Sequence, residues 1–259
     1  MRLKFNPSNN RLRFILTVGF TWLLMGVLFL NLGIPPIVIL ILAFLAGSIL
    51  TYFSIREGAS HRDIWILLLL PVLLQLGTSL FIYSLPNKSP LAIVVWLMYL
   101  PLGYATILGA NIFNVARAKT IPLLRVAQTT YFIITLATIF IFISMIHLHA
   151  LNWLLLLIIS GVICYFLVWQ YLWTFNQEHP RSPIFMKEAG LATTLFVEVA
   201  LVLTFFPLKY STRGLLLTTF LYCILGLSRA RREGDMTSRI IAEYAMVVGI
   251  VILLMIISL

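Results

Sequence analysis

The fold is decided by residues 14–55, which read FILTVGFTWLLMGVLFLNLGIPPIVILILAFLAGSILTYFSI and contain no charged side chain. A helix needs about 20 apolar residues to cross a hydrocarbon core about 30 Å thick, so this stretch is too long for a single span. The break lies at residues 31–36, NLGIPP, because glycine loosens the backbone and proline removes a hydrogen-bond donor. The stretch therefore predicts two membrane-spanning helices joined as a tight hairpin.

The same alternation of uncharged runs and short polar loops continues to the end of the chain and predicts seven more spans. The nine predicted spans cover about residues 14–31, 36–55, 64–84, 91–113, 126–147, 152–175, 189–208, 213–228 and 240–259. The eighth is the shortest and relies on Arg213 and Arg229 reaching the two membrane interfaces. We predict an all-α, polytopic transmembrane helical bundle that forms one integral membrane domain over residues 1–259.

The composition excludes a soluble protein. Hydrophobic residues make up 61% of the chain and charged residues 10%, whereas a soluble domain carries about 25% charge. The net charge of +10 would suggest nucleic acid in a soluble protein, but sorting the cations by span gives it another meaning. Fifteen of the 18 Lys and Arg residues fall on one side of the membrane, and only Lys88, Lys209 and Arg213 fall on the other.

Cations are retained on the cytoplasmic side. This uneven distribution predicts a cytoplasmic N-terminus and an outside C-terminus, in the plasma (inner) membrane, with no nucleic-acid partner.

Glu198 is the acidic residue whose position most needs an explanation. It lies near the centre of the predicted span 189–208, where a carboxylate costs about 2.5 to 3.5 kcal/mol on insertion scales. We expect it to face the bundle interior as a proton- or cation-coupling group or a ligand contact. The alternative is a packing residue that ties two helices together, hydrogen-bonded to Thr194 one turn away or to another helix.

The fourth predicted span is the most interrupted, with Pro101 at its middle and Asn111 toward its cytoplasmic end. Transporters build mid-membrane sites from broken helices that expose backbone groups. The third span adds Gln75, four residues after Pro71 and on the same face. The candidates for ligand binding or proton coupling are therefore Glu198, Asn111, Gln75 and Pro101. The alternative for the fourth span is a proline kink with close helix packing.

A basic loop follows the eighth span and contains Arg229, Arg231, Arg232 and Arg239. Cations near a cytoplasmic leaflet attract anionic lipid headgroups at about 1 kcal/mol each, so we expect these arginines to contact anionic lipids. The expected partners are membrane lipids, with a partner membrane subunit or a homo-oligomer as a further possibility. We expect no cofactor and no metal site, since His147 and His149 have no further ligand on their face.

Three classes of function remain open. The best prediction is a small transporter or lipid-handling permease, supported by Glu198 and the interrupted fourth span. The alternative is a non-catalytic membrane subunit or scaffold, because the loops are short and no catalytic constellation is present. An enzyme acting on a lipid-linked substrate is less favoured, since only Glu57, His61 and Asp63 in one cytoplasmic loop suggest acid–base chemistry.

Overall fold

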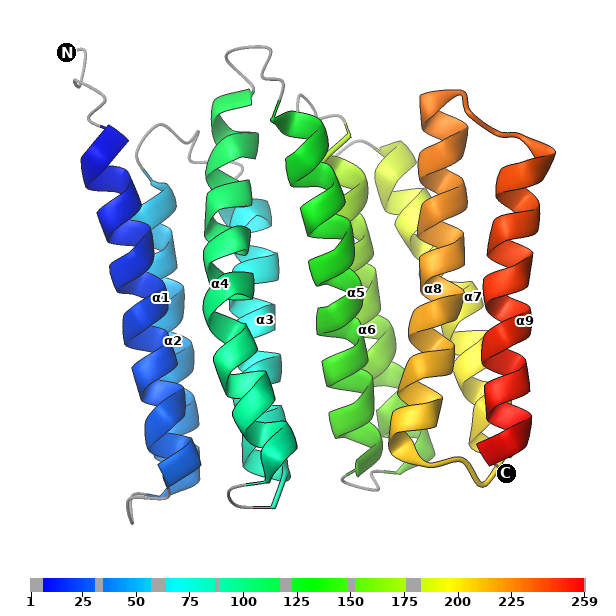
Figure 1. The fold of residues 1–259 in the computed structure, drawn as a ribbon, viewed down its shortest axis with the longest axis horizontal. Helices are drawn as coiled ribbons and strands as arrows, with labels where there is room; N and C mark the ends of the chain where they lie inside the picture. The colour runs from blue at the N-terminus through cyan, green and yellow to red at the C-terminus, as the bar shows by residue number, and fades with distance from the viewer. Residues whose placement is uncertain are drawn as a thin grey trace. The chain divides into compact units, whose positions relative to one another are not determined.

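The computed structural model describes residues 7–30, 35–56, 64–86, 89–116, 123–148, 152–175 and 183–258. Within these ranges the regular structure is entirely α-helical (Figure 1). The helices are α1 (Pro7–Leu30), α2 (Pro36–Ile55), α3 (Ile64–Ser84), α4 (Pro90–Ala116), α5 (Leu124–Leu148), α6 (Trp153–Trp173), α7 (Pro183–Thr204), α8 (Tyr210–Glu233) and α9 (Ser238–Ser258).

The predicted all-α, multi-pass membrane fold is confirmed. Eight of the helices in the described residues are long and apolar enough to cross a membrane, so this is an integral membrane protein with eight candidate spans. The helix outside that set is α7, because it carries Lys187, Glu188 and Glu198. The orientation of the termini stays a prediction.

Helices α2 and α3 have the same limits as the predicted spans 36–55 and 64–84, whereas the limits of α1, α7 and α8 differ from those of their predicted spans. α7 begins at Pro183 rather than at 189, since proline at the first helical position costs no hydrogen bond. α8 extends over 24 residues instead of the predicted 213–228, and it ends at Glu233, followed by the capping residue Gly234, whose φ of 76° is left-handed. A helix of that length is roughly 36 Å long, and its additional residues include charged ones at its C-terminal end, so the limits of the eighth span within α8 stay a prediction.

The chain folds into two compact units. Unit 1 comprises Met1–Ile134 and Trp173–Pro180, and unit 2 comprises Thr135–Leu172 and Arg181–Leu259. In unit 1, α1 packs on α2 and α4, and α3 packs on α2 and α4, which closes a four-helix arrangement (Figure 1). In unit 2, α8 contacts both α7 and α9.

Polar side chains fix the helix pairs of unit 1. The Trp22 and Trp96 rings stack at 4.2 Å between centroids, and each indole N–H donates to the other residue's carbonyl, at 3.1 and 3.0 Å. This reciprocal pair joins α1 to α4. The residue before Trp22 on α1 is Thr21, and its hydroxyl lies 3.0 Å from the hydroxyl of Tyr99, about one turn after Trp96 on α4. These contacts set the register of α1 and α4, which both contribute residues to the site described next.

Candidate functional site

A groove of about 1410 Å³ runs along the surface of unit 1 between α1 and α2. Exposed apolar side chains form its walls, and one residue of α4 completes it. The apolar lining consists of Ile15, Leu16, Gly19, Phe20, Trp22 and Leu23 from α1, Ala46, Ile49, Leu50 and Phe53 from α2, and Leu100 from α4. Pockets for drug-sized molecules hold about 300 to 1000 Å³, so this groove has room for a larger apolar ligand.

One end of the groove is polar. Arg13 of α1 and Arg56, which follows the last residue of α2, both line it there. They meet at the same end because α1 and α2 run in opposite directions (Figure 1). Just below them, the Thr17 and Ser54 hydroxyls are hydrogen-bonded to each other at 2.7 Å. The groove therefore combines two cations at its mouth with apolar walls beneath them.

Two small residues leave the middle of the groove open. A Cβ added to Gly19 would meet no atom within 4 Å, and Ala46 of α2 contributes only a methyl group to the lining. Bulky side chains at Phe20 and Phe53 border this opening. The hollow thus results from small residues placed among large ones on two adjacent helices.

The groove has the depth of about one membrane leaflet. Its lining follows α1 from Arg13 to Leu23, which is roughly 15 Å at 1.5 Å per residue. The hydrocarbon core of a bilayer is about 30 Å thick. The geometry suits an amphiphile with an anionic headgroup at the arginines and an acyl chain lying between the helices.

The candidates predicted in the third and fourth spans do not come together in one site. Gln75 is buried in α3, and its amide N–H donates to the carbonyl of Ala43 in α2. Pro101 lies on the exposed side of α4, and Asn111 is half-buried. Helix α4 continues through Pro101 without a break. Gln75 therefore joins two helices. A role of Gln75, Pro101 and Asn111 in ligand binding stays a prediction.

Glu198 lies on the exposed face of α7 rather than in the packed interior expected from the sequence. The interior positions on this helix belong to Ala192, Phe196 and Ala200, on the opposite side. The Thr194 hydroxyl, expected to bond the carboxyl group, donates instead to the Gly190 carbonyl at 3.0 Å. Glu198 makes no hydrogen bond or ion pair with any residue that the structure describes. Its proposed role in coupling stays a prediction.

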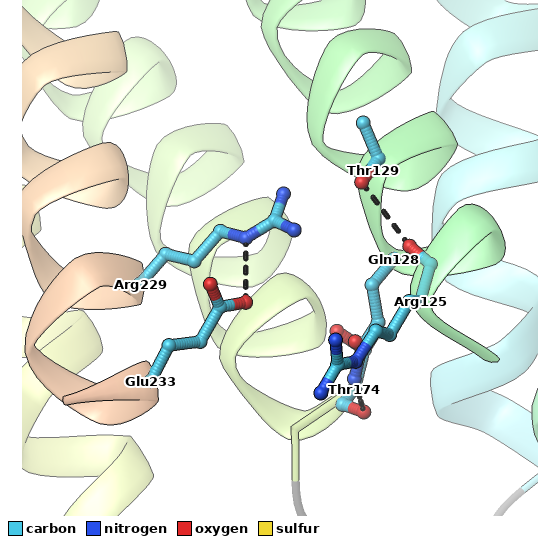
Figure 2. A network of polar contacts seen from close by, with 6 residues as sticks. All are labelled: Arg125, Gln128, Thr129, Thr174, Arg229 and Glu233. Atoms are coloured by element: carbon cyan, nitrogen blue, oxygen red, sulfur yellow. Dashed lines mark hydrogen bonds and ion pairs between the residues drawn. The ribbon is translucent and has the colours of Figure 1, made fainter. Parts of the chain in front are cut away.

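Three of the four arginines predicted to contact lipid form ion pairs within unit 2. Arg229 donates to Glu233 at 2.9 Å (Figure 2), and Arg239 lies 3.3 Å from Glu243. Arg232 pairs with Glu188 of α7 and lies over the Phe185 ring, 5.0 Å from its centroid. Arg231 is exposed. Pairing neutralises much of the predicted positive surface, so lipid contact at this loop also stays a prediction.

A second polar contact in Figure 2 belongs to unit 1. The buried Gln128 of α5 donates its amide N–H to the Thr174 carbonyl at 2.9 Å, and the Thr129 hydroxyl donates to the Arg125 carbonyl. The first bond ties the start of α5 to the residue that follows α6. The Gln128 amide and the Thr174 carbonyl are each other's partners, so their hydrogen bond is a structural contact.

Glu57, His61 and Asp63, on which the enzyme alternative depended, lie outside the described residues. Among the residues that the structure does describe, no group of three or more His, Cys, Asp or Glu side chains could hold a metal ion. Sequence reasoning missed the groove altogether. The available signal was Arg13 and Arg56 at matching ends of the first two helices, with Gly19 and Ala46 inside them.

A family model described as "Protein of unknown function (DUF5656)" matches residues 15–258. No curated protein and no solved structure matches the chain.

Proposed function

The chain belongs to the DUF5656 family of multi-pass membrane proteins of unknown function, and from this premise we propose that it is a lipid-handling protein that binds an anionic lipid between α1 and α2. The observation that carries the proposal is the groove of unit 1, with apolar walls along one leaflet's depth and Arg13 and Arg56 at one end. This is the lipid-handling branch of the function predicted from the sequence.

The position of the two arginines at one end of the groove is consistent with the predicted orientation of the protein in the membrane. The end with the two arginines is the end that the cation distribution predicts to be cytoplasmic, where anionic lipids attract basic residues. The arginine guanidinium is well suited to a phosphate group because its planar donors match two oxygens at once. Lipid reaches the groove sideways from the leaflet, since the walls are exposed along their length.

The length of the groove supports lipid binding rather than lipid transport across the membrane. It extends along roughly half of the hydrocarbon core, and a path for moving a lipid across the membrane would need to extend further. We therefore propose uptake of a lipid from one leaflet as the function of this surface.

The proposal is tested by filling the hollow. Gly19→Leu places a branched side chain in the open space, and Gly249→Leu is the matched control, because Gly249 on α9 also has no atom within 4 Å of an added Cβ. Each protein is exchanged into membranes of phosphatidylglycerol and phosphatidylcholine, and retained lipid is measured by native mass spectrometry. We expect the wild type and Gly249→Leu to retain phosphatidylglycerol and Gly19→Leu to lose it. Equal retention by Gly19→Leu contradicts the proposal.

A second pair of variants tests the headgroup. We expect Arg13→Gln with Arg56→Gln to abolish the preference for phosphatidylglycerol over phosphatidylcholine. Arg11→Gln is the control, since Arg11 is an exposed cation on the same helix that does not line the groove. Inorganic phosphate in excess should not displace the lipid, because the apolar walls supply most of the contact. Displacement by phosphate alone would show a simple anion site.

A further inference from the structure

Helix α7 has one packed face and one exposed face. Its packed face contacts α8. Helix α6 also approaches α7, since a Cβ added at Gly161 of α6 would lie 3.0 Å from the Val197 side chain. The opposite face is exposed and includes Leu191, which is 67% exposed, and Glu198. The two faces divide the helix along its length, so the exposed face is a continuous surface.

The exposed face follows a seven-residue repeat. Ile184, Leu191 and Glu198 are seven residues apart, and each is followed three residues later by another exposed residue, Lys187, Thr194 or Leu201. Alternating steps of three and four are the spacing with which two helices pack along a shared seam. We call these six residues the α7 seam.

Glu198 makes lipid a poor cover for the α7 seam. It lies almost midway along the chain between Glu188 and Lys209, the nearest charged residues on either side. A carboxylate at such a depth costs about 2.5 to 3.5 kcal/mol. Glu198 has no hydrogen-bond or ion-pair partner among the described residues, and a partner that covers this face would supply the group that compensates it.

We propose that the α7 seam is the interface of a symmetric homodimer, in which the Glu198 carboxyl groups of two copies hydrogen-bond to each other. Two copies inserted into one membrane have the same orientation, so their α7 helices run parallel and identical seam positions meet across the two-fold axis. A second copy is thus certain to present a carboxyl group at the same depth.

Carboxyl groups can satisfy one another. In its protonated form a carboxyl group has one donor and remaining acceptor capacity, so two of them pair reciprocally. Polar side chains that hydrogen-bond between helices hold transmembrane helices together in this way. A single polar residue in such a seam also fixes which positions face each other. The dimer does not depend on the groove of unit 1, and either proposal can fail alone.

The first test measures the mass of the protein in lipid nanodiscs. We expect the wild type and Glu198→Gln to be dimers of the 29.4 kDa chain, because an amide also donates and accepts, and Glu198→Leu to shift to the monomer. Glu243→Leu is the control, since Glu243 is an exposed carboxylate on α9. A monomeric wild type, or the same state for Glu198→Gln and Glu198→Leu, overturns the proposal.

The second test leaves Glu198 intact and does not rely on a destabilising variant. Single cysteines are placed at Leu191 or Leu201 in a chain carrying Cys164→Ala and Cys223→Ala, and an oxidant is added in the membrane. Identical cysteines form a disulfide between copies only where their Cα atoms approach within about 7 Å. We expect a cross-linked dimer at both seam positions and none for the control Leu253→Cys, on exposed α9. No cross-link at the seam, or equal cross-linking at Leu253, overturns the proposal.

Discussion

At the scale of single residues, several polar side chains of unit 1 join neighbouring helices. Gln75 is the clearest case, since its amide reaches the Ala43 carbonyl of α2. This is possible only because Gly47 leaves room, as a Cβ at that position would overlap the Gln75 side-chain amide. The sequence identifies Gln75 as a polar residue in lipid. It does not reveal whether the partner is a ligand or a carbonyl, because that carbonyl lies on another helix.

The Gly47 contact leads to a first prediction. Gly47→Ala should destabilise the protein by about 1 to 3 kcal/mol, because the added methyl group overpacks a tight helix contact. Gly19→Ala should have little effect, since no atom lies within 4 Å of the added Cβ. The measurement is the thermal unfolding midpoint of both variants in the same detergent. Equal midpoints would mean that α2 and α3 can separate to accommodate the methyl group.

At the scale of helices, the sequence predicts the presence of each helix better than the residues at which it begins and ends. The predicted limits of α2 and α3 are correct because Pro36 and the charged residues around 56–63 bound uncharged runs. The prediction for α7 stopped at its charged residues, although a helix can continue through Lys187 and Glu188 where they reach the membrane surface. Arg13, Arg56, Gly19 and Ala46 are visible in the sequence, but their spacing alone does not predict the groove, because the groove depends on which faces of α1 and α2 meet.

The Trp22–Trp96 pair supports a prediction for the contact between α1 and α4. Trp96→Phe retains a stacked ring but loses one indole hydrogen bond, so we expect a loss of about 1 kcal/mol. Trp96→Ala removes the ring contacts as well and should cost about 3 to 5 kcal/mol. Trp65→Phe serves as the control, since Trp65 is 76% exposed. The free energy of unfolding of the three variants is measured by chemical unfolding followed by circular dichroism. We expect the loss of stability to be largest for Trp96→Ala, and the reverse order would contradict a stabilising role of the Trp22–Trp96 pair.

At the scale of the whole molecule, the cations carry the information about topology. Fifteen of the 18 fall on one side of the nine-span arrangement, and this arrangement requires α7 to cross although its three charges set it apart from the apolar spans. If α7 did not cross, the arginines after α8 would move to the outside. In the predicted orientation, the net charge of +10 comes from the loops on the cytoplasmic side.

Two serines provide the matching prediction. Ser211 near the start of α8 should lie outside, and Ser238 at the start of α9 should be cytoplasmic; both are exposed. In a chain carrying Cys164→Ala and Cys223→Ala, we expect Ser211→Cys to react with an impermeant maleimide in intact cells. Ser238→Cys should react only after permeabilisation. The opposite pattern would invert the predicted orientation, and labelling of both in intact cells would contradict nine crossings.

If lipid enters the α1–α2 groove from the leaflet, as proposed, its entry route has a consequence for how the occupancy of the groove is controlled. A ligand that enters from the leaflet never passes through water, so the variable that sets its binding equilibrium is its mole fraction among the surrounding lipids. Diluting cells or vesicles leaves that fraction unchanged. Enzymes that synthesise or degrade the anionic lipid change it directly. A protein built in this way would respond to the composition of its own membrane.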